Sequence, residues 1–340
     1  MNQLQVCTNN RAKDLTTGYE KCIDCGKCTK HCLFLEKYGM NLKDYANRPE
    51  LAYNCYLCGE CKRVCPVDID GRQLSLDLRE KRVEEGYNPY LKGYGTLLLE
   101  KKNYIFKNYR DVNSKIVFFP GCNFPAYYPV TAGIISEKLK EDFWISTIFD
   151  CCGRPMADLN MKKEEGDIKR RLSNRFNKLG IEELILVCPN CYHYFKSNFD
   201  IKVSMIYEHD DIMDSFIPED NFREIEGLIF LPCPDKDHRT IYKMLEKYMN
   251  NDEIREIDDI QCCGAGGCAA IKEKELTKDL QDKFKKYDRK IYTYCATCSG
   301  MITKSNTNVE HIICKLFNTD EEISTGINTV KNRALFALKR

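Results

Sequence analysis

Cysteine is the residue type in this chain whose number and spacing could support chemistry. One pattern, C-x2-C-x2-C-x3-C, occurs twice, at Cys22, Cys25, Cys28 and Cys32 and again at Cys55, Cys58, Cys61 and Cys65. The short spacing places three thiolates on one tight loop, which suits the face of an iron–sulfur cluster. Zinc sites instead use isolated Cys-x-x-Cys pairs at longer separation. The two runs therefore predict two cubane [4Fe–4S] clusters.

The ligands of these clusters are expected to be exchanged between the two runs. In two-cluster proteins of the bacterial ferredoxin type, the fourth cysteine of each run ligates the other cluster. We therefore assign one set, the first cubane set, to Cys22, Cys25, Cys28 and Cys65. The second cubane set is Cys32, Cys55, Cys58 and Cys61.

A second cysteine pattern is a longer unit that is also repeated. Each copy has a lone Cys, then Cys-Cys-Gly, then Cys-x-x-Cys, and the step from the lone Cys to Cys-Cys-Gly is equal in the two copies. Such self-similarity indicates that one structural unit has been duplicated. The first five-cysteine set is Cys122, Cys151, Cys152, Cys188 and Cys191, and the second is Cys233, Cys262, Cys263, Cys295 and Cys298.

Five thiolates per copy exceed what a zinc ion or a cubane needs. The extra thiolate indicates a bridging ligand in an unusual cluster or a redox-active thiol beside a metal. The alternative is a structural zinc with four thiolates in each copy and one spare thiol. Nearby glycines are expected to let the backbone approach cluster sulfide and direct N–H groups at its charge, namely Gly153, Gly264, Gly266 and Gly267.

Other reactive residues lie outside these two patterns. His193 follows Cys191 closely and could supply a proton, but a packing or surface role is the simpler interpretation. We expect His311 in the core or beside the ligands, and Cys268 at a buried helix position. Cys7 and Cys314 receive no assignment.

The elements that must position these cysteines alternate between strand and helix patterns. Short apolar runs at 116–119, 143–149, 184–187 and 203–207 are repeated at 228–231, 253–257, 291–294 and 309–313. Helical patterns lie between them, for example Ile168, Leu172, Phe176 and Leu179 with Gly180 as a C-cap. Such alternation predicts parallel-sheet α/β units. The cysteines fall at or just after the carboxyl ends of the strands, where open α/β sheets build their sites.

The fold class expected from these patterns is a multi-domain α+β protein with a mainly helical N-terminal dicluster module and two duplicated α/β cysteine-rich domains. We place the dicluster domain at 1–112, the cysteine-rich domains at 113–222 and 223–317, and a helical C-terminal tail at 318–340.

Composition excludes several classes of function. The chain has 21 cysteines but no evident export signal, so metal ligation fits better than a disulfide framework. A net charge of +1 without a basic stripe gives no footprint for nucleic acid. No stretch approaches the roughly 20 apolar residues of a membrane span. We therefore expect a cytoplasmic protein, with any membrane association made through a partner protein.

The Cys-Cys-Gly repeat resembles the cysteine-rich domain of heterodisulfide reductase catalytic subunits. The same domain occurs in the iron–sulfur subunits of glycolate oxidase, anaerobic glycerol-3-phosphate dehydrogenase and lactate-utilisation systems. The resemblance covers roughly residues 20–315. It implies that each five-cysteine set ligates a noncubane [4Fe–4S] cluster, with one cysteine bridging, and that a substrate disulfide is cleaved between the two clusters.

Two functional hypotheses follow from this resemblance. In the first, the protein is a heterodisulfide reductase-like enzyme in which electrons pass through two cubanes to two noncubane clusters that reduce a disulfide. In the alternative, it is the electron-transfer subunit of a flavoprotein dehydrogenase complex, exchanging electrons with a quinone, cytochrome or ferredoxin. The chain lacks a Gly-x-Gly-x-x-Gly fingerprint, so both hypotheses require an external flavoprotein, ferredoxin or cytochrome partner.

Overall fold

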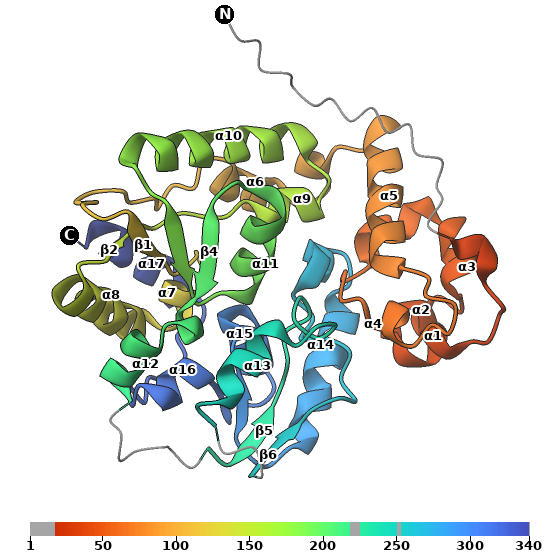
Figure 1. Ribbon diagram of the computed structural model, residues 1–340. Helices are drawn as coiled ribbons and strands as arrows, with labels where there is room; N and C mark the ends of the chain where they lie inside the picture. Colours follow the sequence, from red (N-terminus) through yellow and green to blue (C-terminus); the bar gives the residue numbers. More distant parts are fainter. Residues whose placement is uncertain (1–17, 218–224, 250–252, 340) are drawn as a thin grey trace, which may run out of the picture.

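The computed structural model describes residues 18–217, 225–249 and 253–339, so Cys7 lies outside the described residues. A helical N-terminal unit lies at one side of the molecule, against the second of two α/β units (Figure 1). This arrangement confirms the predicted fold class.

The N-terminal unit consists of short helices because glycines interrupt both cysteine runs. Gly26 and Gly59 have left-handed φ angles of 68° and 80°, and each starts a helix directly after a turn. In chain order the elements before the first sheet are η1 (Tyr19–Lys21), α1 (Lys27–His31), α2 (Leu33–Lys37), α3 (Leu42–Ala46), η2 (Pro49–Asn54), α4 (Glu60–Arg63), α5 (Gly71–Glu84), η3 (Pro89–Leu91) and α6 (Gly95–Lys102). Of these, α6 packs on α9 (Arg154–Asp158) and α10 (Lys162–Leu179) of the first α/β unit. In α5, Leu74 and Leu78 are buried.

The first α/β unit is built on a parallel sheet with the strand order β2-β1-β3-β4. Its strands are β1 (Ile116–Phe119), β2 (Ser146–Thr147), β3 (Glu183–Leu186) and β4 (Lys202–Met205). The helices are α7 (Phe124–Tyr127), α8 (Pro129–Phe143), α9 (Arg154–Asp158), α10 (Lys162–Leu179), α11 (Pro189–Asn198), η4 (Ile206–Glu208) and α12 (Asp210–Phe216).

The second α/β unit repeats this sheet in the order β6-β5-β7-β8, again parallel. Its strands are β5 (Gly227–Ile229), β6 (Ile254–Glu256), β7 (Ile291–Thr293) and β8 (Val309–His311). The other elements are α13 (Thr240–Glu246), η6 (Gly266–Ile271), α14 (Lys274–Asp282), η7 (Lys283–Lys286), α15 (Ala296–Ile302) and α16 (Ile312–Leu316). Equal strand orders in the two units support the duplication inferred from the cysteines.

Local predictions hold for the interiors of these elements and need correction at some ends. The apolar runs expected over 203–207 and 309–313 end as helix, because η4 begins at Ile206 and α16 begins at Ile312. Gly180 ends α10 in the left-handed conformation, and Ile168, Leu172 and Phe176 form its buried face. The strand expected over 143–149 is wrong at its start, because α8 continues to Phe143. Trp144 ends that helix with a φ of 57°, and the strand β2 forms only after this reversal.

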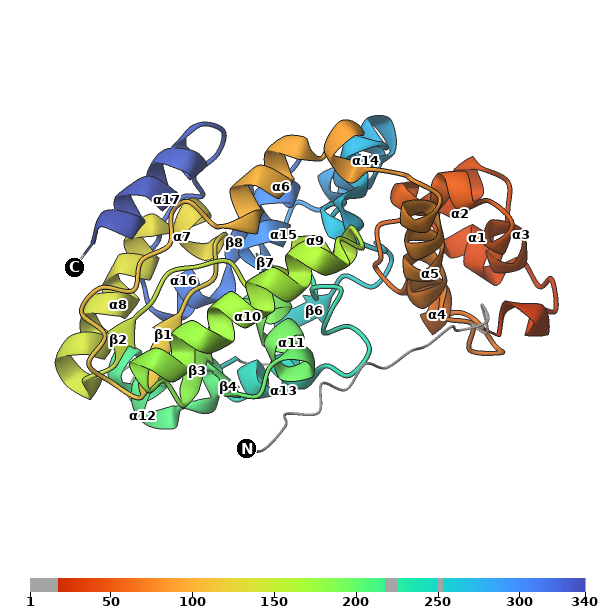
Figure 2. The same cartoon turned by 90° about the horizontal axis from the view of Figure 1, so that it is seen from above.

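The C-terminal segment packs on the first α/β unit. Helix α17 (Asn328–Leu338) lies beside α7 and α8 (Figure 2). Its buried Phe336 ring meets the ring of Phe149 edge-on, with centroids 5.0 Å apart. The helix predicted for 318–340 therefore begins only at Asn328, and it is a packed element that can bring side chains to a site in this unit.

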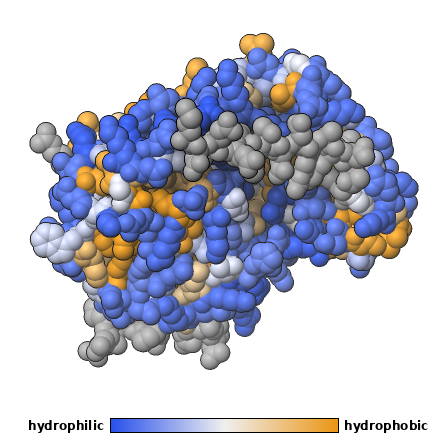
Figure 3. Space-filling model, turned by 45° about the horizontal axis from the view of Figure 1, so that its top comes forward, coloured by the Kyte–Doolittle hydropathy of each residue, from blue (hydrophilic) through white to orange (hydrophobic). Residues whose placement is uncertain are grey.

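The surface seen in Figure 3 is mainly hydrophilic, with apolar side chains gathered in separate areas. Over the described part of the chain, no helix combines the length and apolar character that crossing a bilayer would require.

Candidate functional site

Both five-cysteine sets open on one cavity of about 390 Å³ between the two α/β units. Every member of the first set lines it, as does every member of the second set except Cys262. The second cysteine run contributes Tyr56 and Leu57 to the wall, and α6 contributes Leu97, Glu100 and Lys101. The structure thus brings together cysteines from both units, which lie as far apart in the sequence as Cys122 and Cys298.

The strand ends explain this convergence. Cys122 follows β1, the Cys151-Cys152 pair follows β2, and Cys188 is the residue before helix α11, after β3. In the second unit Cys295 takes the matching place before α15. Because the strands of each sheet are parallel, their carboxyl ends lie at one edge, and both edges face the cavity.

The thiols within each set are hydrogen-bond neighbours. Those of Cys151 and Cys191 lower the pKa of Cys152 to about 5. The Cys262 thiol lowers the pKa of Cys233 to about 6, and burial only partly opposes it. Thiolate is the form that binds metal, so this donor set fits a soft, thiolate-ligated centre.

Four glycines near the cysteines were expected to let the backbone approach cluster sulfide. The structure shows other close contacts at these positions. Gly153 and Gly264 have φ angles of 89° and 87°, which favour glycine, and a Cβ on Gly153 would lie 2.8 Å from Ile168. A Cβ on Gly266 would lie 2.1 Å from the Tyr56 carbonyl oxygen, and one on Gly267 would lie 2.5 Å from that of Cys55. At these two positions the absence of a side chain lets the backbone of the dicluster domain pack closely.

One glycine that sequence reasoning missed lies close to the sulfur of a predicted ligand. Gly121, directly before Cys122, has a φ of 72°, and a Cβ there would lie 3.0 Å from the Sγ of Cys191. The Pro-Gly-Cys tripeptide that holds this glycine was visible in the sequence. It is replaced by Leu-Pro-Cys in the second copy, so the repeat did not single it out.

Three cations in the cavity wall were also missed. Lys101 is 5% exposed and lines the cavity. Burial lowers the pKa of its ammonium group, but negative charge on Cys122 and Cys151 raises it, and the net result is a raised pKa. Arg154 donates to the side-chain oxygen of Asn190 at 2.6 Å. Arg333 reaches the site from α17 and donates to the Cys122 carbonyl oxygen at 3.2 Å. Nothing in the spacing of charged residues distinguishes these three in a chain that is 30% charged.

Polar contacts join the two units at the cavity. The Asn123 amide donates to the Thr297 hydroxyl at 2.7 Å, and the Asn190 amide lies 3.6 Å from the Sγ of Cys295. Each asparagine is adjacent to a cysteine of the first set and contacts the second unit. The relative position of the two five-cysteine sets is therefore fixed by hydrogen bonds beside the cysteines themselves.

The structure also groups the cysteines of the dicluster domain. The four members of the first cubane set line one small cavity, including Cys65 from the second run. In the second cubane set, burial and then charge on Cys32, Cys55 and Cys58 raise the pKa of Cys61, which places these thiols around it. Cys25 is exposed, whereas Cys32, Cys58 and Cys61 are buried. The first cubane set is thus the outer one.

The remaining candidates lie mostly apart from the cavity. The His193 Nε2 atom is 3.5 Å from the Asp235 carboxylate and does not line the cavity, in keeping with a packing role. His311 is buried against the rings of Phe124 and Tyr128, as expected for a core residue. The buried Cys314 lies 3.4 Å from the Thr131 hydroxyl.

Cys268 differs from its expectation. It is half-buried, with a left-handed φ of 57° in η6, and it lines the cavity. The element that carries it, η6, packs against η2 of the dicluster domain and against α9 and α14.

Comparison with known protein families agrees with this architecture. The 4Fe-4S dicluster domain matches residues 21–70, and the cysteine-rich domain matches twice, at residues 116–196 and 228–303. The chain is therefore an iron–sulfur protein that combines a dicluster domain with two cysteine-rich domains.

Three curated proteins of methanogens are similar to the chain. They are an uncharacterised iron–sulfur protein of Methanococcus maripaludis (24% identity, 76% of this chain and 61% of the relative), one of Methanocaldococcus jannaschii (23%, 72% and 58%) and the B subunit of the fumarate reductase (CoM/CoB) of Methanothermobacter marburgensis (24%, 84% and 67%). The chain thus spans about three fifths to two thirds of the length of these relatives. No solved structure matches significantly.

Proposed function

We propose that this iron–sulfur protein exchanges electrons between an external carrier and a disulfide or thiol substrate bound in the cavity. The observation that carries the proposal is the opening of both five-cysteine sets on one cavity. A disulfide has two sulfur atoms, and each takes one electron when the bond breaks. The overall reaction is RS–SR′ + 2 e⁻ + 2 H⁺ → RSH + R′SH, with the electrons supplied by the carrier.

The cofactors proposed for this chain are two cubane [4Fe–4S] clusters on the two cubane sets and a noncubane [4Fe–4S] cluster on each five-cysteine set. When bound, such clusters supply one-electron transfer. The donor sets fit this assignment because five thiols converge in each unit, and hydrogen bonds from neighbouring thiols favour the thiolate form of Cys152 and of Cys233. Zinc, the alternative in the cysteine-rich domains, has no redox chemistry and would leave the dicluster domain without an acceptor.

Residues of this chain provide the electrostatic environment for substrate sulfur. Lys101, Arg154 and Arg333 place three cationic groups in the cavity wall, together with two carboxylates: Glu100 pairs with Lys101 and Arg333, and Asp158 with Arg154. Thiolate products are anions, so the cationic groups stabilise them until protons arrive. Tyr127 presents a phenol to the same cavity from α7.

The alternative function is a relay within a dehydrogenase complex. One relative is named as a subunit of a reductase, and this supports a multi-subunit assembly with a flavoprotein, ferredoxin or cytochrome partner. Two complete five-cysteine sets around one cavity favour substrate chemistry over a relay, because a relay needs no space between its terminal centres.

The test is metal analysis and turnover of the full chain purified without oxygen. We expect about sixteen irons per chain, four clusters of four, an oxidised-state EPR signal that responds to added thiols, and reduction of a disulfide by an artificial reductant. About eight irons with two zincs would overturn the reductase proposal. Four clusters that accept electrons but leave every tested disulfide intact would favour the relay.

A further inference from the structure

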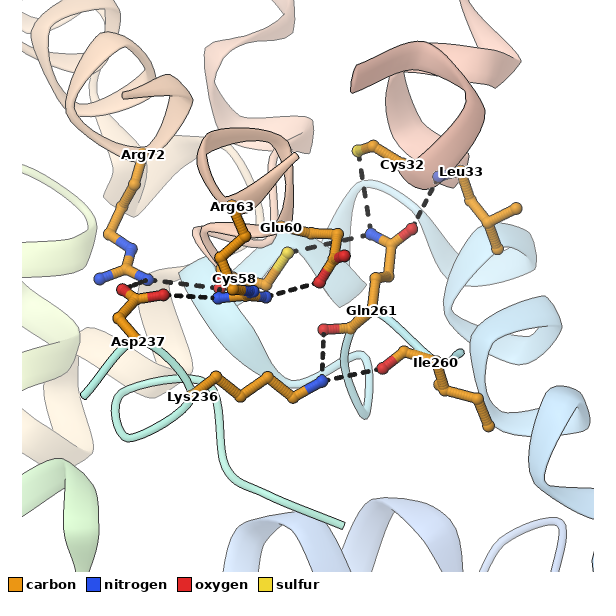
Figure 4. Close-up of polar contacts among 10 residues, drawn as sticks. All are labelled: Cys32, Leu33, Cys58, Glu60, Arg63, Arg72, Lys236, Asp237, Ile260 and Gln261. Atoms are coloured by element: carbon orange, nitrogen blue, oxygen red, sulfur yellow. Dashed lines mark hydrogen bonds and ion pairs between the residues drawn. The ribbon is translucent and has the colours of Figure 1, made fainter. Parts of the chain in front are cut away.

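Gln261 connects the second cysteine-rich domain to the dicluster domain. It directly precedes Cys262 and Cys263, is 5% exposed, and extends its side chain between α2 and α4 toward the second cubane set (Figure 4). A buried amide needs partners for both its oxygen and its nitrogen. The partners of Gln261 lie in the other domain.

The orientation of this amide is determined by the backbone. The N–H of Leu33 donates to the Gln261 Oε1 atom at 2.7 Å, and only the oxygen of the amide can accept that bond. The Lys236 ammonium group donates to the carbonyl oxygens of Ile260 and Gln261, at 2.9 and 3.4 Å (Figure 4). Hydrogen bonds fix both the main chain and the side-chain oxygen of Gln261, and they therefore fix the orientation of its NH₂ group.

That direction is toward two sulfur atoms. The Gln261 Nε2 atom lies 3.8 Å from the Sγ of Cys32 and 3.9 Å from the Sγ of Cys58. Both cysteines belong to the second cubane set, one from each run. N–H donors to ligand sulfurs stabilise the charge that a cluster gains on reduction, and they are one of the factors that set its potential.

The two arginines at this junction are paired with carboxylates. Arg63 and Arg72 each donate to the Cys58 carbonyl oxygen at 3.3 Å, which orients the loop but does not reach its sulfur. Arg63 pairs with Glu60 at 2.6 Å and with Asp237 at 2.9 Å, and Arg72 lies 3.6 Å from Asp237 (Figure 4). Among these groups the amide is the one that contacts the sulfurs directly.

We propose that Gln261 is a positioning residue that raises the reduction potential of the second cubane and holds it against the second cysteine-rich domain. The proposal rests on the assignment of Cys32 and Cys58 to that cubane. The thiols of Cys58 and Cys262 are hydrogen-bond neighbours, so the two ligand sets are in contact at this place. A cluster on the second cubane set would therefore lie next to the second five-cysteine set.

The experiment is an anaerobic redox titration of the full chain followed by EPR, with no disulfide present. The second cubane is identified as the one whose signal changes in Cys61→Ser. Gln261→Leu removes both N–H···S contacts and should lower its potential by about 59 mV, a tenfold change in the one-electron equilibrium. The first cubane should not shift.

Two further variants separate this role from folding. Gln261→Glu keeps an oxygen for the Leu33 N–H but replaces the donor with an anion, so it should lower the potential more than Gln261→Leu. Gln281→Leu is the matched control, because Gln281 is a buried glutamine of the same unit whose amide lies 3.8 Å from the sulfur of Met301. This control should leave both cubane potentials unchanged.

Full iron content with an unchanged second-cubane potential in Gln261→Leu and Gln261→Glu would overturn the proposal. Loss of the second cubane from Gln261→Leu together with an unshifted potential in Gln261→Glu would do the same. Absence of disulfide turnover in the parent chain affects only the proposed function, since the titration uses no substrate.

Discussion

The guanidinium group of Arg79 donates to the carbonyl oxygen of Gly267 at 2.9 Å, and thereby joins the dicluster domain to the second cysteine-rich domain. Arg79 is 0% exposed. It also donates to the carbonyl oxygens of Ala52 and Cys55, at 2.9 and 2.8 Å, and to that of Asp158 in the first cysteine-rich domain. A single buried side chain therefore connects all three domains around the cavity.

Replacing Arg79 should destabilise the whole assembly. Arg79→Leu leaves several buried carbonyl groups without donors, and each costs about 1–3 kcal/mol. We expect a loss of at least about 3 kcal/mol in the free energy of unfolding, measured by chemical denaturation without oxygen. Arg79→Lys keeps the charge but not the planar fork, so it should recover only part of the loss. A loss below about 1 kcal/mol in both variants would contradict this role.

Gly266 should not tolerate a methyl group, because its Cβ would meet the Tyr56 carbonyl oxygen at 2.1 Å. Gly266→Ala should lower stability by about 1–3 kcal/mol, as overpacking does, and loosen the contact between η6 and the dicluster domain. Gly166→Ala is the matched control, since Gly166 lies within α10 with its nearest neighbour at 3.7 Å. It should stabilise by about 0.5–1 kcal/mol. Equal thermal shifts in the two variants would refute the steric argument.

The exchange of ligands between the two cysteine runs predicts which substitutions affect the same cluster. Cys65→Ser and Cys25→Ser should perturb one cubane EPR signal, because both residues line the outer cavity. Cys32→Ser and Cys58→Ser should perturb the other. Iron analysis checks that each variant retains its remaining clusters. If Cys65→Ser and Cys58→Ser changed the same signal, the assignment of the two cubane sets would be incorrect.

His311 should make the protein sensitive to acid. Burial lowers the pKa of its imidazole from 6.5 to about 3. Between these values the unfolded chain binds a proton that the folded chain does not, so stability is complete above pH 6.5 and falls as the pH drops toward 3. At pH 5 this amounts to about 2 kcal/mol. His311→Phe should remove this part of the pH dependence.

The measurement is the free energy of unfolding of wild type and His311→Phe at several pH values between 5 and 7.5. The difference between the two proteins isolates His311, because both carry the same cysteines. Parallel curves would show that the imidazole is not the group responsible.

The cysteines by themselves determined much of this protein. The spacing of two short runs indicated iron–sulfur ligation, since thiolates close together on one loop suit few other groups. The repeat of Cys-Cys-Gly indicated duplication, and the alternation of short apolar runs such as 184–187 with helical patterns indicated parallel-sheet α/β units. Each of these features is a pattern of residue types along the chain, so the sequence alone is enough to reveal it.

Tertiary packing alone decided how the parts meet. Lys101 and Arg333 lie far from the cysteine repeat in sequence, and they reach the cavity only because α6 and α17 pack on the first cysteine-rich domain. Gly266 is required by a carbonyl group of another domain, and the sulfur partners of Gln261 come from the two separate cysteine runs. Contacts between residues so distant along the chain leave no periodicity in a single sequence, because only the folded backbone brings them within hydrogen-bonding reach.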